Sequence, residues 1–280
     1  MAKSALLKSS IGKKYWMALT GLFLCLFLVG HLIGNLQLIF GTDLQFNQYA
    51  YFMTSNPAVK VLSYLTYFSI LFHAVDGIIL TIQNKKARPI GYAKNNASAN
   101  STAASRNMAV LGTLLLVFIV THMCNFWAKM HFSEMPLQHQ VMETPNPMTG
   151  EMMKTVVYNT TTGGFIQEDQ VKMGALEIKN GKEFYIPQTD LKFAEGYKDL
   201  YKITIDFFKD PSFGLIATIG YVLAMAVLGF HLSHGFKSAF QSLGLNHPNY
   251  NKFINNFGTA FSIIVPLLFA IIPLYIHFVK

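Results

Sequence analysis

Five long stretches of this chain are apolar enough to cross a lipid bilayer as single helices. Each has the roughly twenty residues that an α-helix needs to span about 30 Å of hydrocarbon. The stretches lie near residues 15–39, 60–82, 108–129, 213–235 and 258–279. The first is too long for a signal peptide and lacks a small-residue cleavage site, so we expect it in the mature chain. The pattern predicts an all-α integral membrane protein with five transmembrane helices in a bundle.

The connection between the third and fourth stretches is much longer than the others. It contains turn-forming clusters such as TTGG at 161–164 with short strand-like runs around them, and it ends in DLYKITIDFFKDP at 199–211, whose apolar residues recur at helical spacing. We therefore expect three regions. They are residues 1–131 with transmembrane helices 1–3, residues 132–211 as an insertion ending in an amphipathic interfacial segment, and residues 212–280 with helices 4–5.

Composition agrees with a membrane protein, at 52% hydrophobic and 13% charged residues. The basic residues gather on one side of the predicted membrane. Nine of them lie before span one or between spans two and three, whereas the connection between spans one and two has only Lys60. The nine are Lys3, Lys8, Lys13, Lys14, Lys85, Lys86, Arg88, Lys94 and Arg106. This bias predicts a cytoplasmic N-terminus, an extracytoplasmic C-terminus and an extracytoplasmic insertion. The net charge of +8 therefore does not indicate nucleic-acid binding.

The candidate chemistry lies in four histidines inside the spans. Spans one to four each supply one of them, and ionisable side chains at membrane depth usually mark a function. They are His31, His73, His122 and His231. The only two cysteines, Cys25 and Cys124, also lie inside spans, which excludes a disulfide framework and an iron–sulfur site.

The depths of the histidines predict two pairs. At 1.5 Å per residue, His31 and His122 lie about 25 and 24 Å from the inner boundary, and His73 and His231 about 15 and 10 Å. Two pairs about 12 Å apart along the membrane normal are what two stacked bis-histidine haems b require. With both axial positions of each iron occupied, such haems favour electron transfer over oxygen or substrate binding.

Nearby residues fit this interpretation to different degrees. Gly34, Gly77 and Gly235 lie within one helical turn of a histidine and are candidates for making room for a porphyrin, although glycine is common in membrane helices. The remaining imidazole N–H of a ligand needs an acceptor, for which we expect a backbone carbonyl one turn back or, for His73, the hydroxyl of Ser69.

Two further side chains leave alternatives open. His234 is also on span four, but His231 matches the depth of His73 and is the preferred ligand. Asp76 is the only acid within a span and lies three residues after His73, where it either accepts a proton near the inner haem or is an acid held by a neighbouring group.

Four stretches of the sequence resemble the five-helix dihaem cytochrome b subunit of succinate:quinone oxidoreductases and fumarate reductases, the respiratory complex II enzymes linked to the tricarboxylic acid cycle. They are MALTGLFLCLFLVGHLIGN at 17–35, FHAVDG at 72–77, THMCNFW at 121–127 and FHLSHGFKSAFQSLGLNHPNY at 230–250. The likeness covers all five spans in order but not the insertion. It implies that His31 and His122 ligate a distal haem and that His73 and His231 ligate a proximal one.

The resemblance also implies a bacterial cytoplasmic membrane location, partners and a substrate. The partners are a flavoprotein subunit with FAD and an iron–sulfur subunit on the cytoplasmic side, because this chain has no dinucleotide fingerprint and no dicarboxylate site of its own. It would be the quinone-reactive electron-transfer subunit, with menaquinone as substrate near the distal haem. Candidate quinone contacts are Asn35, Gln37 and Trp127. No catalytic residue is assigned.

Two other functions remain open at this stage. A dihaem cytochrome b of another respiratory dehydrogenase would also need paired histidines, but such subunits use fewer helices and other spacings. A transporter or proton channel with intramembrane histidines is expected to show inverted repeats or broken helices, and none is visible. Some members of the resembling family place a proton-carrying glutamate two residues before the fourth-helix ligand, where this chain has Gly229.

Overall fold

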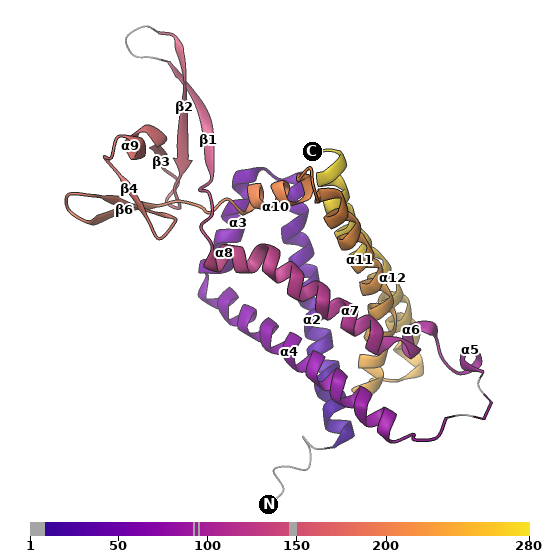
Figure 1. Ribbon diagram of the computed structural model, residues 1–280. Helices are drawn as coiled ribbons and strands as arrows, with labels where there is room; N and C mark the ends of the chain where they lie inside the picture. The colour runs from indigo at the N-terminus through magenta and orange to yellow at the C-terminus, as the bar shows by residue number, and fades with distance from the viewer. Residues whose placement is uncertain (1–8, 92, 95, 146–149) are drawn as a thin grey trace, which may run out of the picture.

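The computed structural model describes residues 9–91, 93–94, 96–145 and 150–280, and the five predicted spans are all helical in it (Figure 1). Five helices are long and apolar enough to cross a membrane. They are α2 (Ser10–Phe40), α4 (Pro57–Lys86), the third span Met108–Phe132, α11 (Gly214–Ser242) and α12 (Pro248–Phe278). The prediction of a multi-pass membrane protein is confirmed at this level.

The third span changes its helical form near its end. It runs as α7 (Met108–His122), then as a π-helix, η1 (Met123–Ala128), and closes with α8 (Lys129–Phe132). The sequence pattern did not predict the π segment, because a π-helix differs from an α-helix by one residue in its hydrogen-bond register and leaves the apolar composition unchanged.

Shorter helices join the spans. They are α3 (Asp43–Ser55), α5 (Ala97–Asn100), α6 (Ala103–Arg106), α9 (Glu168–Lys172) and α10 (Leu200–Lys209). Local sequence sets the sharp turn from α3 to α4: the Asn56 side chain accepts hydrogen bonds from the N–H groups of Ala58 and Val59 at 2.9 and 3.3 Å, and Pro57 occupies the first helical position.

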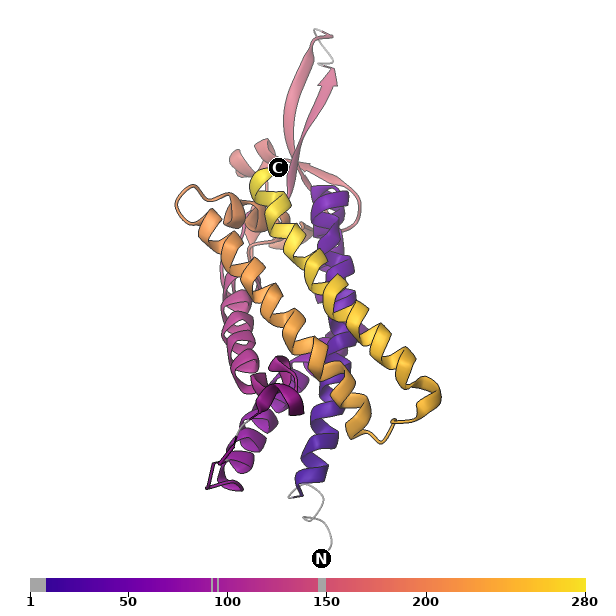
Figure 2. The same cartoon turned by 90° about the vertical axis from the view of Figure 1, so that its right-hand side faces the viewer.

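Four of the long helices pack as a ring. Along this ring α2 packs against α4, α4 against α7, α7 against α11 and α11 against α2. The fifth, α12, lies outside the ring and packs against α11 and α2 (Figure 2). The diagonal helices, α2 with α7 and α4 with α11, therefore face each other across the centre of the bundle.

Small residues allow α12 to approach α11 closely. Pro266 lacks an N–H and so leaves the carbonyl oxygen of Ser262 without its helical partner. Gly229 of α11 lies against that oxygen, since a Cβ atom added at Gly229 would be 3.0 Å from it. Close backbone approach of this kind is typical of helix pairs in membranes.

Residues between the third span and α10 form a β-rich lobe at one end of the bundle, the end where the C-terminus also lies (Figure 1). We call this the lobe end. One antiparallel sheet has the order β1 (His139–Pro145), β2 (Met152–Asn159), β3 (Phe165–Gln167), and the other has the order β4 (Glu177–Lys179), β5 (Glu183–Ile186), β6 (Leu191–Glu195). The lobe has a small core of its own, formed by Leu137, Ile166, Leu176 and Phe184. The all-α expectation therefore holds for the bundle, and the insertion adds strands to it.

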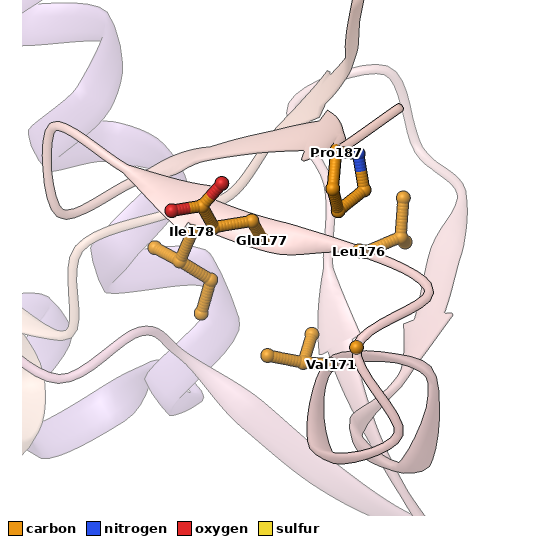
Figure 3. A pocket seen from close by; sticks show the side chains of 6 residues that line it. Val171, Leu176, Glu177, Ile178 and Pro187 are labelled. Carbon is orange, nitrogen blue, oxygen red and sulfur yellow. The ribbon is translucent and has the colours of Figure 1, made fainter. Parts of the chain in front are cut away.

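Beside this core the lobe has a shallow hollow, shown in Figure 3. Its lining is mostly apolar and comes from Val171, Gly174, Leu176, Glu177, Ile178 and Pro187. Glu177 is the only charged lining residue.

The lobe is tied to the bundle by a buried polar clamp between α3 and α10. Asn47 of α3 is 1% exposed, and its Nδ2 donates to Oδ1 of Asp199 at 2.8 Å. The Oδ1 of Asn47 accepts from the backbone N–H of Tyr201 at 2.9 Å, while Asp199 also caps α10 by accepting from the N–H of Lys202. The clamp satisfies the first turn of α10, the amphipathic helix predicted at 199–211.

Candidate functional site

The rings of His31 and His122 meet between α2 and α7. Their centroids are 5.9 Å apart and their planes are nearly perpendicular, at 86°. Both rings lie among apolar aromatic side chains, with Phe27 stacked on His31 at 5.3 Å and Phe118 stacked on His122 at 5.7 Å. Each of these phenylalanines precedes its histidine by four residues, which places the two side chains on one helix face.

His73 and His231 meet in the same way between α4 and α11. Their ring centroids are 6.2 Å apart and the planes make an angle of 70°. The structure thus brings together the histidines that were paired by depth in the sequence. Both pairs join helices that are diagonal in the four-helix ring, so both lie at its centre rather than at a contact between neighbouring helices.

The separation of the two pairs can be read along α2. The ring of His73 lies beside Gly21, because a Cβ atom there would be 3.1 Å from its Cε1. His31 follows Gly21 by ten residues, so the pairs are about 15 Å apart at 1.5 Å per residue. This is close to the separation of about 12 Å expected from the sequence.

Two other helices give the same spacing. On α7, Gly112 lies beside His231, with a hypothetical Cβ atom 3.8 Å from its Cε1, and His122 follows ten residues later. On α11, the Tyr221 hydroxyl contacts His122 at 3.3 Å, and His231 follows ten residues later. Three helices therefore place the pairs about 15 Å apart.

The acceptor for His73 comes from a neighbouring helix. Its Nδ1 lies 3.2 Å from the backbone oxygen of Met17 and 3.4 Å from Oγ1 of Thr20, both on α2. This differs from the expected acceptors on its own helix, a carbonyl one turn back or Ser69. Thr20 Oγ1 donates to the Trp16 carbonyl at 2.7 Å, as hydroxyls inside helices commonly do, and is thereby fixed beside the ring.

The second histidine of this pair lacks such a partner. Nδ1 of His231 is buried and has no hydrogen-bond partner among the described residues. A buried polar nitrogen without a partner costs free energy, which is accepted at functional sites more often than elsewhere.

The pair near the lobe end has polar neighbours from two helices. Nδ1 of His122 lies 3.3 Å from the hydroxyl of Tyr221, which also accepts from Nδ2 of Asn125 at 3.3 Å. Asn35 donates to the backbone oxygen of His31 at 2.8 Å, and its Nδ2 is 3.4 Å from Nδ1 of that ring. Sequence reasoning missed Tyr221, because nothing in the sequence of one helix shows which residue of another will face it.

Of the three glycines expected to make room for a porphyrin, Gly34 is filled by a protein side chain, and the other two keep open space beside them. Gly34 makes room for the ring of Tyr49, which a Cβ atom would meet at 2.5 Å, and Gly77 and Gly235 would each have only a methionine methyl within reach, at 3.9 Å. The glycines that lie beside histidine rings are Gly21 and Gly112. They went unnoticed because each lies on a different helix from the histidine it accommodates.

The distance between the two rings of each pair suits a metal held between two imidazoles. Two metal–nitrogen bonds of about 2 Å, each extended by about 1 Å to a ring centre, put the centroids about 6 Å apart. In His73 and His122 the contacted nitrogen is Nδ1, which leaves Nε2 as the ligating atom. Within the described residues, no group of three or more His, Cys, Asp or Glu side chains is arranged to hold a metal ion, so a site here would rest on a pair.

The candidate quinone contacts are not gathered at one point. Asn35 lies against His31, as described above, and Trp127 donates from Nε1 to the hydroxyl of Tyr67 at 2.8 Å while stacking on His131 at 4.6 Å. Gln37 is half-buried on α2 and accepts from the Gly41 N–H through its backbone oxygen. In the part of the chain that is described, no hydrogen bond joins these three candidates.

Of two remaining positions, Gly229 has a packing explanation and Asp76 has none. Gly229 stands where the resembling family has a glutamate in some members, and the Cβ atom of any side chain there would lie only 3.0 Å from the Ser262 oxygen and would crowd α12. Asp76 is half-buried on α4, and the described residues offer it no ion pair or hydrogen bond.

Comparison of the chain with protein-family models, with curated proteins and with solved structures finds no match in any of the three.

Proposed function

We propose that this chain is the membrane cytochrome b subunit of a succinate:quinone oxidoreductase, in which His31 and His122 hold one haem b and His73 and His231 hold another. The observation that carries the proposal is the placement of two histidine pairs across the centre of the helix ring, with ring centroids 5.9 and 6.2 Å apart. The four family-like sequence stretches support the choice of enzyme.

Each haem, held by two histidines, would supply a one-electron carrier. The protein's own part is to fix the ligands and to exclude water. The Met17 carbonyl and the Tyr221 hydroxyl each contact the Nδ1 atom of a ligand and so orient its ring. Phe27, Phe118 and Phe269 make the surroundings of the pair near the lobe end apolar, with Phe269 centred 5.7 Å from His31.

The basic residues of the N-terminus and of the α4–α7 connection support a cytoplasmic location for the end opposite the lobe. In that orientation the His73–His231 pair is nearer the cytoplasm, where a flavoprotein with FAD and an iron–sulfur subunit would bind and deliver electrons. The lobe would be extracytoplasmic, and the membrane would be the cytoplasmic membrane of a bacterium.

We place a membrane quinone, menaquinone by family resemblance, beside the His31–His122 pair. Asn35 is the candidate nearest to it, because its amide contacts His31. Trp127 and Gln37 remain candidates. Dicarboxylate chemistry belongs to the partner subunits, and this chain contributes membrane anchoring and electron transfer.

A reduced-minus-oxidised spectrum of the purified complex tests the proposal. We expect two b-type haems, one lost in His31→Ala with His122→Ala and the other lost in His73→Ala with His231→Ala. His131→Ala is the control, because its ring is exposed and stacks on Trp127, and it should retain both haems. A stable wild-type protein without haem would overturn the proposal. Two haems without succinate–quinone activity in the complex would favour another respiratory dehydrogenase.

A further inference from the structure

We infer that Tyr221 is a positioning residue that, with Asn125, sets the reduction potential at the His31–His122 site. This inference rests on the proposed function. It starts from one hydroxyl group that faces two nitrogen atoms: Tyr221 Oη lies 3.3 Å from Nδ1 of His122 and 3.3 Å from Nδ2 of Asn125.

The directions of these hydrogen bonds follow from the chemistry of the groups. A neutral imidazole that binds a metal through Nε2 carries its hydrogen on Nδ1, so His122 must donate. The Asn125 amide nitrogen is also only a donor. The oxygen of Tyr221 therefore accepts hydrogen bonds from both His122 and Asn125. The bond from Asn125 makes this oxygen a weaker acceptor for His122.

The tyrosine is held in place by rings from two helices. Its ring makes edge-to-face contacts with Phe118 of α7 and Phe208 of α10, both with centroids 5.0 Å away and planes nearly perpendicular. Such contacts favour one ring orientation. Asn125 belongs to the π segment that begins directly after His122, a helical form that is frequent at functional sites.

The other site has a different acceptor. Nδ1 of His73 faces the backbone carbonyl of Met17, at 3.2 Å, and a peptide carbonyl is a stronger acceptor than a phenol oxygen already shared with an amide. A strong acceptor makes a ligand more basic and stabilises the oxidised metal. Tyr221 and Asn125 thus leave His122 less basic than His73, and a less basic His122 favours the reduced form at its own site.

Redox titration of two variants of the complex tests this inference. Tyr221→Phe removes only the acceptor. The midpoint potential of the haem at His31 and His122 should therefore rise by up to about 59 mV, which corresponds to a tenfold change in the equilibrium constant of a one-electron reduction. Asn125→Leu leaves the phenol oxygen to His122 alone and should shift the same haem in the opposite direction. The other haem should not change in either variant.

Tyr67→Phe is the matched control, because that hydroxyl accepts from Trp127 and contacts no intramembrane histidine. Both haems should keep their potentials in it. Unchanged potentials in Tyr221→Phe and Asn125→Leu, with both haems bound, would overturn the inference and leave the proposed function standing. If Tyr221→Phe loses the haem, Asn125→Leu decides: a downward shift supports the inference and no shift overturns it. A haem-free wild type would instead overturn the proposed function.

Discussion

At Gly229 the lack of a side chain allows two helices to touch through their backbones. The carbonyl oxygen of Ser262, which Pro266 leaves without a helical donor, lies against the α-carbon of this glycine. A Cβ atom at this position would lie 3.0 Å from that oxygen, so the space beside the glycine is tight for any side chain. The same position cannot hold a proton-carrying glutamate without moving α12.

We expect Gly229→Ala to destabilise the bundle, because its methyl group would lie 3.0 Å from the Ser262 oxygen and would push α11 and α12 apart. Overpacking of this kind typically costs about 1–3 kcal/mol. Thermal unfolding in detergent measures the effect. Gly220→Ala on the same helix is the control, since nothing lies within 4 Å of its added Cβ atom. Equal melting temperatures for the two variants would contradict this account.

The four histidines could be paired from the sequence because helical rise is uniform and depth needs no knowledge of packing. Their polar partners could not. The carbonyl of Met17 belongs to a residue type with no polar side chain, and Tyr221 is one of thirteen tyrosines in the chain. Which of them faces a histidine depends on the rotation of one helix relative to another, and the pattern of a single helix does not contain that information.

Strands β5 and β6 carry a compact group of opposite charges. Lys192 contacts Glu183 and also Glu195, at 3.2 Å, and Lys182 contacts Glu195. Hydrogen bonds from Lys192 and Asn180 hold the pKa of Glu183 below its usual 4.5. Burial raises the pKa of Glu195, but the bonds from Lys182 and Lys192 outweigh it and the net pKa is lowered.

Lowered carboxylate pKa values predict that the lobe loses stability in acid. The two carboxylates stabilise the folded lobe fully at pH values above their unfolded pKa near 4.5. This stabilisation is lost as the pH falls through their lower pKa values in the folded state. The protection factors of the amides of residues 183–195 in hydrogen exchange, which correct for the intrinsic pH dependence of exchange, should therefore fall below about pH 4.5. Lys192→Met should make this acid dependence smaller. Lys154→Met is the control, because its 3.7 Å pair with Glu143 is exposed, and an identical loss of acid dependence in it would refute the assignment.

The long helices were easier to predict from the sequence than the strands of the lobe. Spans and the amphipathic helix α10 have strong periodic or apolar signals over ten residues or more. The lobe has strands of three to eight residues that pair with their neighbours along the chain, and isolated bridges such as the one between Leu137 and Lys198 join its more distant segments. Only turns and short strand-like runs were therefore visible in its sequence.

The two ends of the molecule differ: the lobe and the C-terminus lie at one end, and helix α2 begins at the other (Figures 1 and 2). The buried Asn47–Asp199 clamp holds the end of the lobe that joins α10 against α3. Sidedness of the membrane insertion therefore follows from the position of any one lobe residue.

We expect the lobe to be accessible from the extracytoplasmic side only. In a background with Cys25→Ser and Cys124→Ser, a membrane-impermeant thiol reagent applied to intact cells should label Lys154→Cys and not Lys86→Cys. Inverted membrane vesicles should give the reverse result, because basic connections remain cytoplasmic. Labelling of Lys86→Cys in intact cells would reverse the orientation and move the partner subunits to the lobe end.

On α2, α7 and α11, ten residues separate the contact with one histidine pair from the contact with the other. The distance between the pairs is therefore set by the number of residues in each of these intervals. Each residue of an α-helix adds 1.5 Å and about 100° of rotation. Removing one residue between Gly112 and His122 would change the distance only slightly but would turn the histidine away from its partner. Substitutions can therefore accumulate in these intervals while insertions and deletions cannot. The π segment lies just beyond His122, where an irregular turn leaves the interval intact.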